Sequence, residues 1–249
     1  IACGSGYPLF PMPAHGLAGI KDNGSFHQAI RALSLEQKWE FTMYTPPAFS
    51  DQDVESIRAT IRAARLANLV TATAGGPLVT PLPLFLDEAE GGHGVLYGHI
   101  AKANPHWRSV PIGEGLAVFM GPEAYITPSW YATKRETRKV VPTWNYVAVH
   151  AHGPVEFFHE PERLIAVVTR LTNLHEESKV QPWQVSDAPD EYVAAQLRGI
   201  VGIRMPITRL EGKKKMSQNR SEADRRGVAA GLAESERPSD HSIAKLVEF

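Results

Sequence analysis

The stretch GVLYGHIAKANPHWR (residues 94–108) begins with an apolar run and ends in a dense group of polar side chains. The run GVLYGHI (94–100) is typical of a buried strand. From Gly98 to Arg108 the chain then carries two imidazoles, two cations, a carboxamide and an indole. Such a strand end is either a polar corner that faces water or the wall of a site for an anionic, aromatic ligand.

Short strand patterns lie on both sides of this stretch. Further strands are predicted over 115–121, 123–127, 144–153, 154–159 and 200–212. Two β-rich runs flank Gly75-Gly76, which predicts a hairpin, and Pro81 and Pro83 restrict its second strand to an edge or a bulge. Closely spaced strands separated by Gly and Pro favour a small antiparallel barrel over repeated βαβ units.

Helical patterns occupy most of the remaining chain. Helices are predicted over 51–67, 160–178, 189–197 and 221–236, the last of them largely polar. Ser50 and Asp53 fit a capping box at the start of the first helix. Between the strands, the polar loop 128–143 is too long for a tight turn, and long loops are often functional. The sequence therefore predicts the α+β class, a barrel with helices packed outside it.

The composition of the whole chain limits the possible partners. The chain has 249 residues and a formal net charge of −1, so no global charge attracts nucleic acid or an anionic membrane. Cys3 is the only cysteine, which excludes an intrachain disulfide and a thiolate metal site. No apolar run approaches the roughly 20 residues that span a bilayer. These features favour the cytoplasm.

Residues 1–42 differ from the rest of the chain. They are rich in Gly and Pro, lack periodicity, and have no basic residue ahead of an apolar segment, so they do not resemble a secretory signal. Met43 opens MYTPPAFS, which resembles a natural chain start. We expect 1–42 to be a poorly ordered extension, and 43–249 to form a single domain with a helical C-terminal segment.

A basic segment near the C-terminus could bind an anion. Between positions 204 and 226, eight basic residues stand against three acidic ones. Its centre, EGKKKMSQNR (211–220), follows a predicted strand and precedes a predicted helix. Cations, a hydroxyl and carboxamides around a helix N-terminus are what a phosphate requires. The alternative is a basic turn that only faces water.

Aromatic side chains gather in the segments between these two groups. They are Trp107, Tyr125, Trp130, Tyr131, Trp144 and Tyr146. Aromatic planes beside carboxamides and hydroxyls suit a planar heteroaromatic ring with polar edges. The alternative is that these rings fill the core of the barrel.

Neither a metal site nor the common catalytic motifs find support in the sequence. His150 and His152 lie on one face of a predicted strand, and His99 or His106 as a third ligand would give a zinc-like set. Such pairs are more often surface or core histidines. The sequence contains no G-x-S-x-G, G-x-G-x-x-G or Walker motif, so a serine nucleophile, a dinucleotide fold and phosphoryl transfer have no support.

Five motifs together resemble the PaiB family of FMN-binding negative transcriptional regulators. They are MYTPPAF, GHIAKANPHW, GPEAYITPSWY, VPTWNYVAVHAHG and EGKKKMSQNRSEADRRGV, in the family's order across about residues 43–232. The resemblance implies the FMN-binding split β-barrel with flanking helices. It also implies a homodimer that binds its ligand at the subunit interface.

The resemblance further implies a set of cofactor-binding residues. Lys102, Ser129 and Lys215 become candidates for the FMN phosphate; Asn104, Gln218 and Asn219 would serve the ribityl chain or the ring edge, and Trp107 or Trp130 would cover the ring. The same fold houses haem-binding relatives, among them N–N bond-forming enzymes of the piperazate synthase type, which share ANPHW and PTWN. With haem, His99 becomes the candidate axial ligand.

Three functions therefore stay open. The first is an FMN-binding negative transcriptional regulator, although the sequence shows no helix-turn-helix and only segment 204–226 could contact DNA. The second is a flavin- or haem-dependent enzyme in which the cofactor carries the redox chemistry, with His99, His106 and Tyr125 as possible acid–base groups. The third is a barrel without a ligand that acts through protein contacts.

Overall fold

The computed structural model describes residues 42–64 and 66–247. The predicted extension 1–42 lies, apart from Thr42, outside the described residues. Residues from Met43 onward form one unit by their contacts, and the helices and strands below belong to it.

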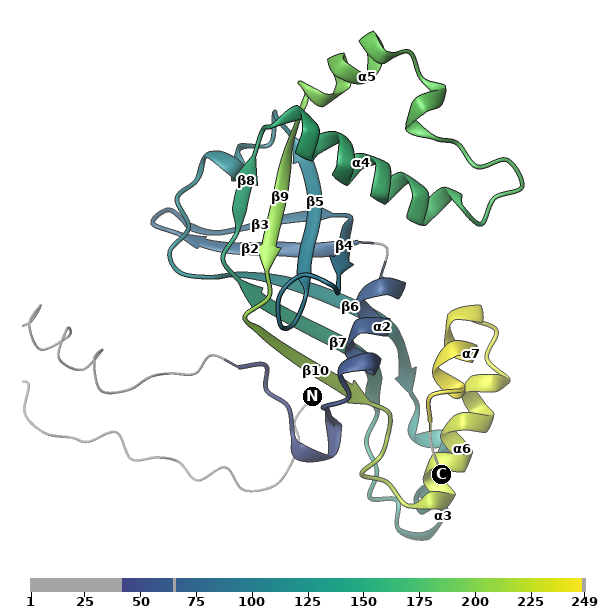
Figure 1. Cartoon of the computed structure of the whole chain (residues 1–249). Coiled ribbons are helices and arrows are strands. Elements are labelled where there is room, and N and C mark those ends of the chain that lie inside the picture. The colour runs from purple at the N-terminus through teal and green to yellow at the C-terminus, as the bar shows by residue number, and fades with distance from the viewer. Residues whose placement is uncertain (1–41, 65, 248–249) are drawn as a thin grey trace, which may run out of the picture. The chain divides into compact units, whose positions relative to one another are not determined.

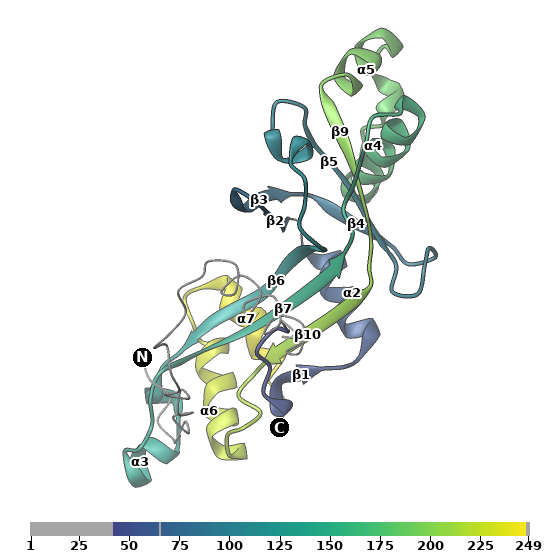
Figure 2. The same cartoon turned by 90° about the vertical axis from the view of Figure 1, so that its left-hand side faces the viewer.

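Two antiparallel sheets make up this unit (Figures 1 and 2). The first has the order β1 (Ser50–Asp51), β10 (Arg209–Lys215), β7 (Thr143–Gly153), β6 (Gly115–Ile126), β2 (Ala67–Thr73) and β3 (Gly76–Leu82). The second has the order β4 (Leu84–Asp87), β5 (Val95–Ala101), β9 (Ile200–Pro206) and β8 (Glu156–Phe158). The predicted antiparallel arrangement is confirmed. So is the edge position of β3, whose Pro81 cannot donate to a ladder.

The strand predicted over 200–212 is two strands in different sheets. The N–H of Ile207 donates to the carbonyl of Gly94 at 3.0 Å, and the N–H of Thr208 donates to the carbonyl of His152 at 2.9 Å. The chain therefore changes sheets at this point, and the single-strand prediction was wrong. Residues 213–215, predicted in a turn, lie in β10. Conversely, the two strands predicted over 115–127 form one strand, β6, with a bulge between Met120 and Glu123.

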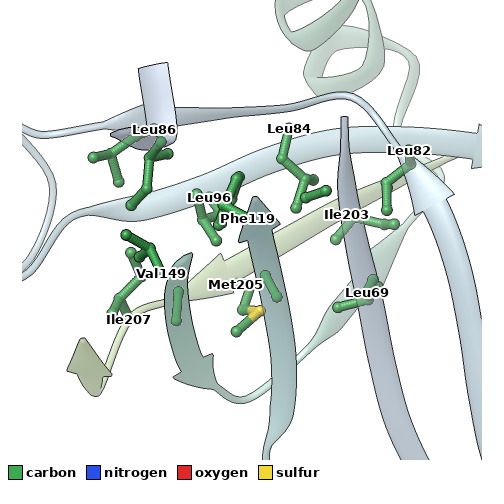
Figure 3. Close-up of a cluster of buried hydrophobic side chains, with 14 of the residues drawn as sticks. Leu69, Leu82, Leu84, Leu86, Leu96, Phe119, Val149, Ile203, Met205 and Ile207 are labelled. Atoms are coloured by element: carbon green, nitrogen blue, oxygen red, sulfur yellow. The ribbon is translucent and has the colours of Figure 1, made fainter. Parts of the chain in front are cut away.

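The main core lies between the two sheets (Figure 3). Among its members at 1% exposure or less are Leu69, Phe119 and Val149 of the first sheet and Leu96, Ile203 and Met205 of the second. In β2 and β6, alternate residues are buried, as the sequence pattern predicts. Burial of each such side chain contributes about 1.5–3 kcal/mol, so this core holds the two sheets together.

Two amphipathic helices pack against this framework. The first is α2 (Val54–Ala63), which begins after Asp53, whose carboxylate accepts the N–H of Glu55 at 3.1 Å. Asp53 is therefore the N-cap itself rather than the distal member of a box with Ser50. The second is α4 (Pro161–Glu176), which packs against the second sheet through Leu164, Val167 and Leu171. The short helix α5 (Asp190–Leu197) follows as predicted.

The C-terminal segment builds a second core. Here α6 (Glu222–Ala233), predicted to be largely polar, buries Val228 and Leu232, and α7 (Pro238–Ala244), which was not predicted, buries Ile243. These side chains meet Ile126 of β6 and Tyr131. The long loop before β7 contains the 3-10 turn η3 (Pro128–Trp130) and the short helix α3 (Thr133–Thr137).

Helix α6 approaches Trp130 at two glycines. A Cβ atom on Gly227 would lie 2.0 Å from the carbonyl oxygen of Trp130, and one on Gly231 would lie 2.3 Å from its indole ring. Only hydrogen fits at either position. The glycines therefore fix how closely the helix and the Trp130 turn can pack.

We expect Gly227→Ala to destabilise the protein by about 1–3 kcal/mol, because the added methyl meets backbone that cannot move aside. Urea unfolding followed by circular dichroism measures this change. Gly92→Ala is the matched control, since nothing lies within 4 Å of a Cβ atom at Gly92. Equal stability of the two variants would show that α6 does not pack this closely.

Candidate functional site

The polar corner after β5 is built by local hydrogen bonds. The N–H of Lys102 donates to the carbonyl of Gly199 at 2.8 Å, and the side chain of Lys102 is exposed. Asn104 caps the 3-10 turn η2 (Pro105–Arg108) by accepting the N–H of His106 at 2.9 Å. The amide of Asn104 also donates to Thr80 Oγ1 at 3.2 Å. The corner thus presents one exposed ammonium group on a tightly bonded turn.

His106 anchors this corner from inside the barrel. Its side chain is 2% exposed, and its Nε2 and Nδ1 lie 2.7 Å and 2.8 Å from the hydroxyls of Thr71 and Thr80. Burial lowers the pKa of His106, so the ring is neutral and each nitrogen bonds one hydroxyl. No sequence motif marks Thr71 or Thr80, because strands 35 and 26 residues away in the chain bring them to the histidine.

Most of the Trp107 side chain contacts other residues of the same chain. Its Nε1 donates to the carbonyl of Lys102 at 3.0 Å, and the guanidinium of Arg108 lies 4.8 Å from the ring centroid. The ring of His159 meets it edge-on, with centroids 5.0 Å apart. The indole also packs against the main core. Little of it remains to cover a cofactor ring.

His99 lies on a different face from the corner. Strand alternation puts it on the side of Tyr97, which packs with the cluster beneath α4. Its Nδ1 is buried and has no hydrogen-bond partner among the residues that the structure describes. Burial lowers the pKa of His99, so its imidazole is neutral.

The second group of candidates lies near the end of β10. Lys215 Nζ donates to Thr143 Oγ1 at 2.8 Å and to the carbonyl of Trp144. Gln218 holds the following turn, since its Oε1 accepts the N–H of Met216 at 2.6 Å and its Nε2 donates to the carbonyl of Lys214. Both ends of this carboxamide are therefore used by the chain itself.

The remaining members of this group are more open. Asn219 and Ser129 are exposed. The hydroxyl of Ser129 accepts from Lys134 Nζ at 3.1 Å. Both residues therefore stay accessible to a ligand.

Trp130 lines a pocket of about 470 Å³ together with Tyr125, Thr127, Trp144, Ser235, Arg237 and Asp240. The rings of Tyr125 and Trp144 meet edge-on at 5.9 Å and are about half exposed. Tyr131 therefore belongs to the core, as the alternative interpretation has it, whereas Tyr125, Trp130 and Trp144 line a cavity. Arg237 and Asp240 were missed because α7 and the loop before it gave no helical or motif signal.

These rings and Lys215 share one face of the first sheet, which we call the outer face. Cross-strand register assigns to it Arg209, Glu211, Lys213 and Lys215 of β10, Trp144, Tyr146, Ala148, His150 and His152 of β7, and Leu116, Val118, Met120, Glu123 and Tyr125 of β6. The opposite face of these strands carries the two cores. Figure 2 shows the three strands side by side.

Within one chain, the corner at Lys102 and the group around Lys215 lie apart. Asn104 reaches Thr80, which pairs through β2 with Ala117 of β6. Lys215 pairs through β7 with Glu123 of β6. Because the bulge adds a residue to β6, the separation is counted on β7, where their partners Ala151 and Tyr146 are about 17 Å apart at roughly 3.3 Å per residue. The corner at Lys102 and the group around Lys215 are therefore attached to well-separated positions along the sheet.

The residues present have the chemistry that FMN requires. Lys102 and Lys215 supply positive charge for a phosphate, Ser129 and Asn219 supply polar contacts, and the half-exposed rings of the pocket suit a flat heteroaromatic system. A volume of about 470 Å³ is within the usual range for small-molecule sites.

Comparison with known proteins connects this geometry to a family. Residues 43–209 match the family described as "Putative FMN-binding domain". The chain is 33% identical over 207 residues to the protease synthase and sporulation protein PAI 2 of Bacillus subtilis, covering 83% of this chain and 97% of that protein. It is also 33% identical over 241 residues to an uncharacterised protein of Emericella nidulans, covering 82% and 96%.

A solved structure shares the fold. The FAD and haem binding protein from Mycobacterium smegmatis superposes with a TM-score of 0.51 at 12% identity, covering 73% of this chain and 80% of that one. This likeness supports the split-barrel fold and concerns the fold alone. The family match ends at 209, so Lys215, Gln218 and Asn219 lie beyond it. In the described part of the chain, no helix is long and apolar enough to cross a membrane.

We expect stability to fall as the pH drops below about 6.5. The folded chain holds His99 and His106 neutral, whereas the unfolded chain protonates them near their ordinary pKa of 6.5, so the unfolded state binds more protons in acid. The urea concentration at the unfolding midpoint, measured between about pH 8 and pH 5, should therefore show a slope, decreasing toward pH 5. His106→Ala should make it shallower, with the exposed His93→Ala as control. An identical slope in His106→Ala would contradict the burial argument.

Proposed function

The chain belongs to the PaiB family of FMN-binding domains, and from this premise we propose that it binds FMN between two copies of itself. One observation carries the proposal. Along the sheet, the strand position that carries Lys215 and the one to which the corner at Lys102 is bonded are about 17 Å apart, at roughly 3.3 Å per residue. In a homodimer the corner of one copy would complete the site on the other.

Each part of FMN then has a partner of suitable chemistry. Lys102 of one copy and Lys215 of the other hold the phosphate by charge-assisted hydrogen bonds, with Ser129 as a neutral donor. Asn219 serves the ribityl chain, whereas Asn104 is left out because both ends of its carboxamide hold the corner. Trp130, with the other rings of its pocket, covers the flavin. Gln218 is left out because both ends of its carboxamide hold a turn.

We expect the double substitution Lys102→Ala, Lys215→Ala to weaken FMN binding at least tenfold, since each charge-assisted bond contributes about 1.5–3 kcal/mol. Quenching of flavin fluorescence on titration measures the affinity. Lys139→Ala, Lys179→Ala is the matched control, because it removes two exposed lysines elsewhere. Equal affinity of the double variant and the parent would remove these lysines from the site.

A mixing experiment extends this test to the two-chain site. Chains carrying Lys102→Ala alone are unfolded and refolded together with chains carrying Lys215→Ala alone. In a mixed dimer one site carries both changes and the other carries none, so part of the sites should regain the parent's affinity. If each site lies within one chain, no site is restored, and the absence of any recovery would overturn the two-chain arrangement.

Within this proposal the protein acts as a negative regulator of transcription, as the resemblance to the PaiB family implies. The ion pairs of segment 204–226 argue against a direct grip on DNA. Arg204 pairs with Glu90 and Glu156, Arg209 with Glu211, and Arg226 with Glu222. Lys213 is buried. Regulation then works through a partner or through the flavin rather than through this segment.

We therefore expect no tight binding of an operator-like duplex by the purified protein at low salt. Fluorescence anisotropy at two salt concentrations measures it. Binding tighter than the roughly 10⁻⁶ M of non-specific complexes, with a steep loss as salt rises, would instead show that free cations contact phosphates.

A second candidate, a haem-dependent enzyme, is favoured by the buried Nδ1 of His99. A neutral imidazole nitrogen without a partner among the described residues is suited to an axial ligand. The visible spectrum of the purified protein separates the candidates. Two flavin bands support FMN, whereas a Soret band that His99→Ala abolishes supports haem.

A further inference from the structure

The outer face carries a second group of functional side chains, away from Lys215. His150, His152 and Glu211 each offer one ligand atom, and these atoms lie within 4.8 Å of one another. Their side chains are 23%, 14% and 15% exposed, so the group is largely sheltered yet open on one side. The FMN proposal uses none of the three.

Sheet register holds this group in place. Glu211 of β10 pairs directly with His150 of β7, and His152 is two residues further along β7 on the same face. The three side chains therefore project from two hydrogen-bonded strands of one sheet. A site on paired strands is more rigid than one on loops.

The carboxylate of Glu211 is oriented toward the histidines. Its Oε2 lies 3.0 Å from His152 Nε2 and 4.0 Å from His150 Nδ1. Its Oε1 accepts from the guanidinium of Arg209. The N–H of Met43 donates to Oε1 at 3.3 Å and to Oε2 at 3.2 Å. Partners of this kind orient a ligating carboxylate and are typical of the surroundings of metal sites.

The spacing and chemistry suit a transition-metal ion. Two ligand atoms at about 2.1 Å from a tetrahedral ion are about 3.4 Å apart, and small side-chain rotations bring atoms within 4.8 Å to that distance. Two imidazoles with one carboxylate favour first-row transition ions over Mg²⁺ or Ca²⁺, which prefer oxygen.

Lys213 is the cation next along β10 on the same face, and it is already engaged. Its Nζ donates to the carbonyl of Tyr44 at 2.7 Å. It also lies 5.4 Å from the ring centroid of Tyr44 and 5.3 Å from that of Tyr146. These contacts hold the ammonium among oxygen and aromatic acceptors.

We propose that His150, His152 and Glu211 bind one divalent first-row transition-metal ion, for which Zn²⁺ is the probe. Three protein ligands leave a fourth position for water or an added ligand. The inference is independent of FMN, because the metal ligands and the proposed flavin contacts are different residues.

The test uses tag-free full-length protein stripped with a chelator. Isothermal titration with Zn²⁺ should give one ion per chain, and Co²⁺ should give visible d–d bands that excess Zn²⁺ abolishes. We expect His150→Ala, His152→Ala and Glu211→Gln each to weaken Zn²⁺ binding at least tenfold. Circular dichroism and FMN affinity, measured on the same variants, separate loss of the ion from loss of the fold or of the flavin site.

His93→Ala is the matched control, because it removes an exposed histidine outside the cluster. It should bind Zn²⁺ as the parent does. The proposal is overturned if the parent binds no Zn²⁺, or if folded His150→Ala and His152→Ala bind it as tightly as the parent. If Glu211→Gln keeps the parent's full affinity for Zn²⁺, Glu211 is not a ligand and that part of the proposal is overturned.

Discussion

The antiparallel pairing of β6 with β7 is the constraint on which the rest of the structure depends. The side chains of these two long strands point alternately to the two faces of the sheet. One face supplies Phe119 and Val149 to the main core. The opposite face carries Tyr125, Trp144 and His150. A one-residue slip would exchange the two faces. The same pairing therefore fixes the hydrophobic core and the functional surface together.

The length of these strands joins two cores into one unit. Near Ala117 they close the barrel against the second sheet, and near Ile126 they support the C-terminal helices. Trp130 connects the C-terminal core with the candidate site, since it packs against the glycines of α6 and lines the aromatic pocket. The C-terminal segment is thus part of the candidate site rather than an appendage to the barrel.

The outer face separates two kinds of chemistry along one sheet. Lys215 and the rings lie toward one end of β10, whereas Glu211 and the histidine pair lie toward the other. The corner at Lys102 belongs to neither, because the buried His106 ties it to β2 and β3. In the proposed FMN site between two chains, that corner meets the rings, and the histidine pair belongs to the proposed metal site.

The sequence by itself determined most of the strands, the helix α4, the edge position of β3 and the motifs of the family, because alternation, Gly and Pro act on neighbours in the chain. It also located the corner and the H-x-H pair. Only the tertiary structure decided that Glu211, 59 residues from His152, is their partner instead of His99 or His106. Only in the folded chain does Gln218 hydrogen-bond within its turn, and only there are residues 200–212 divided between two sheets. Cross-strand register creates such contacts, and no local pattern encodes which distant residue will stand opposite.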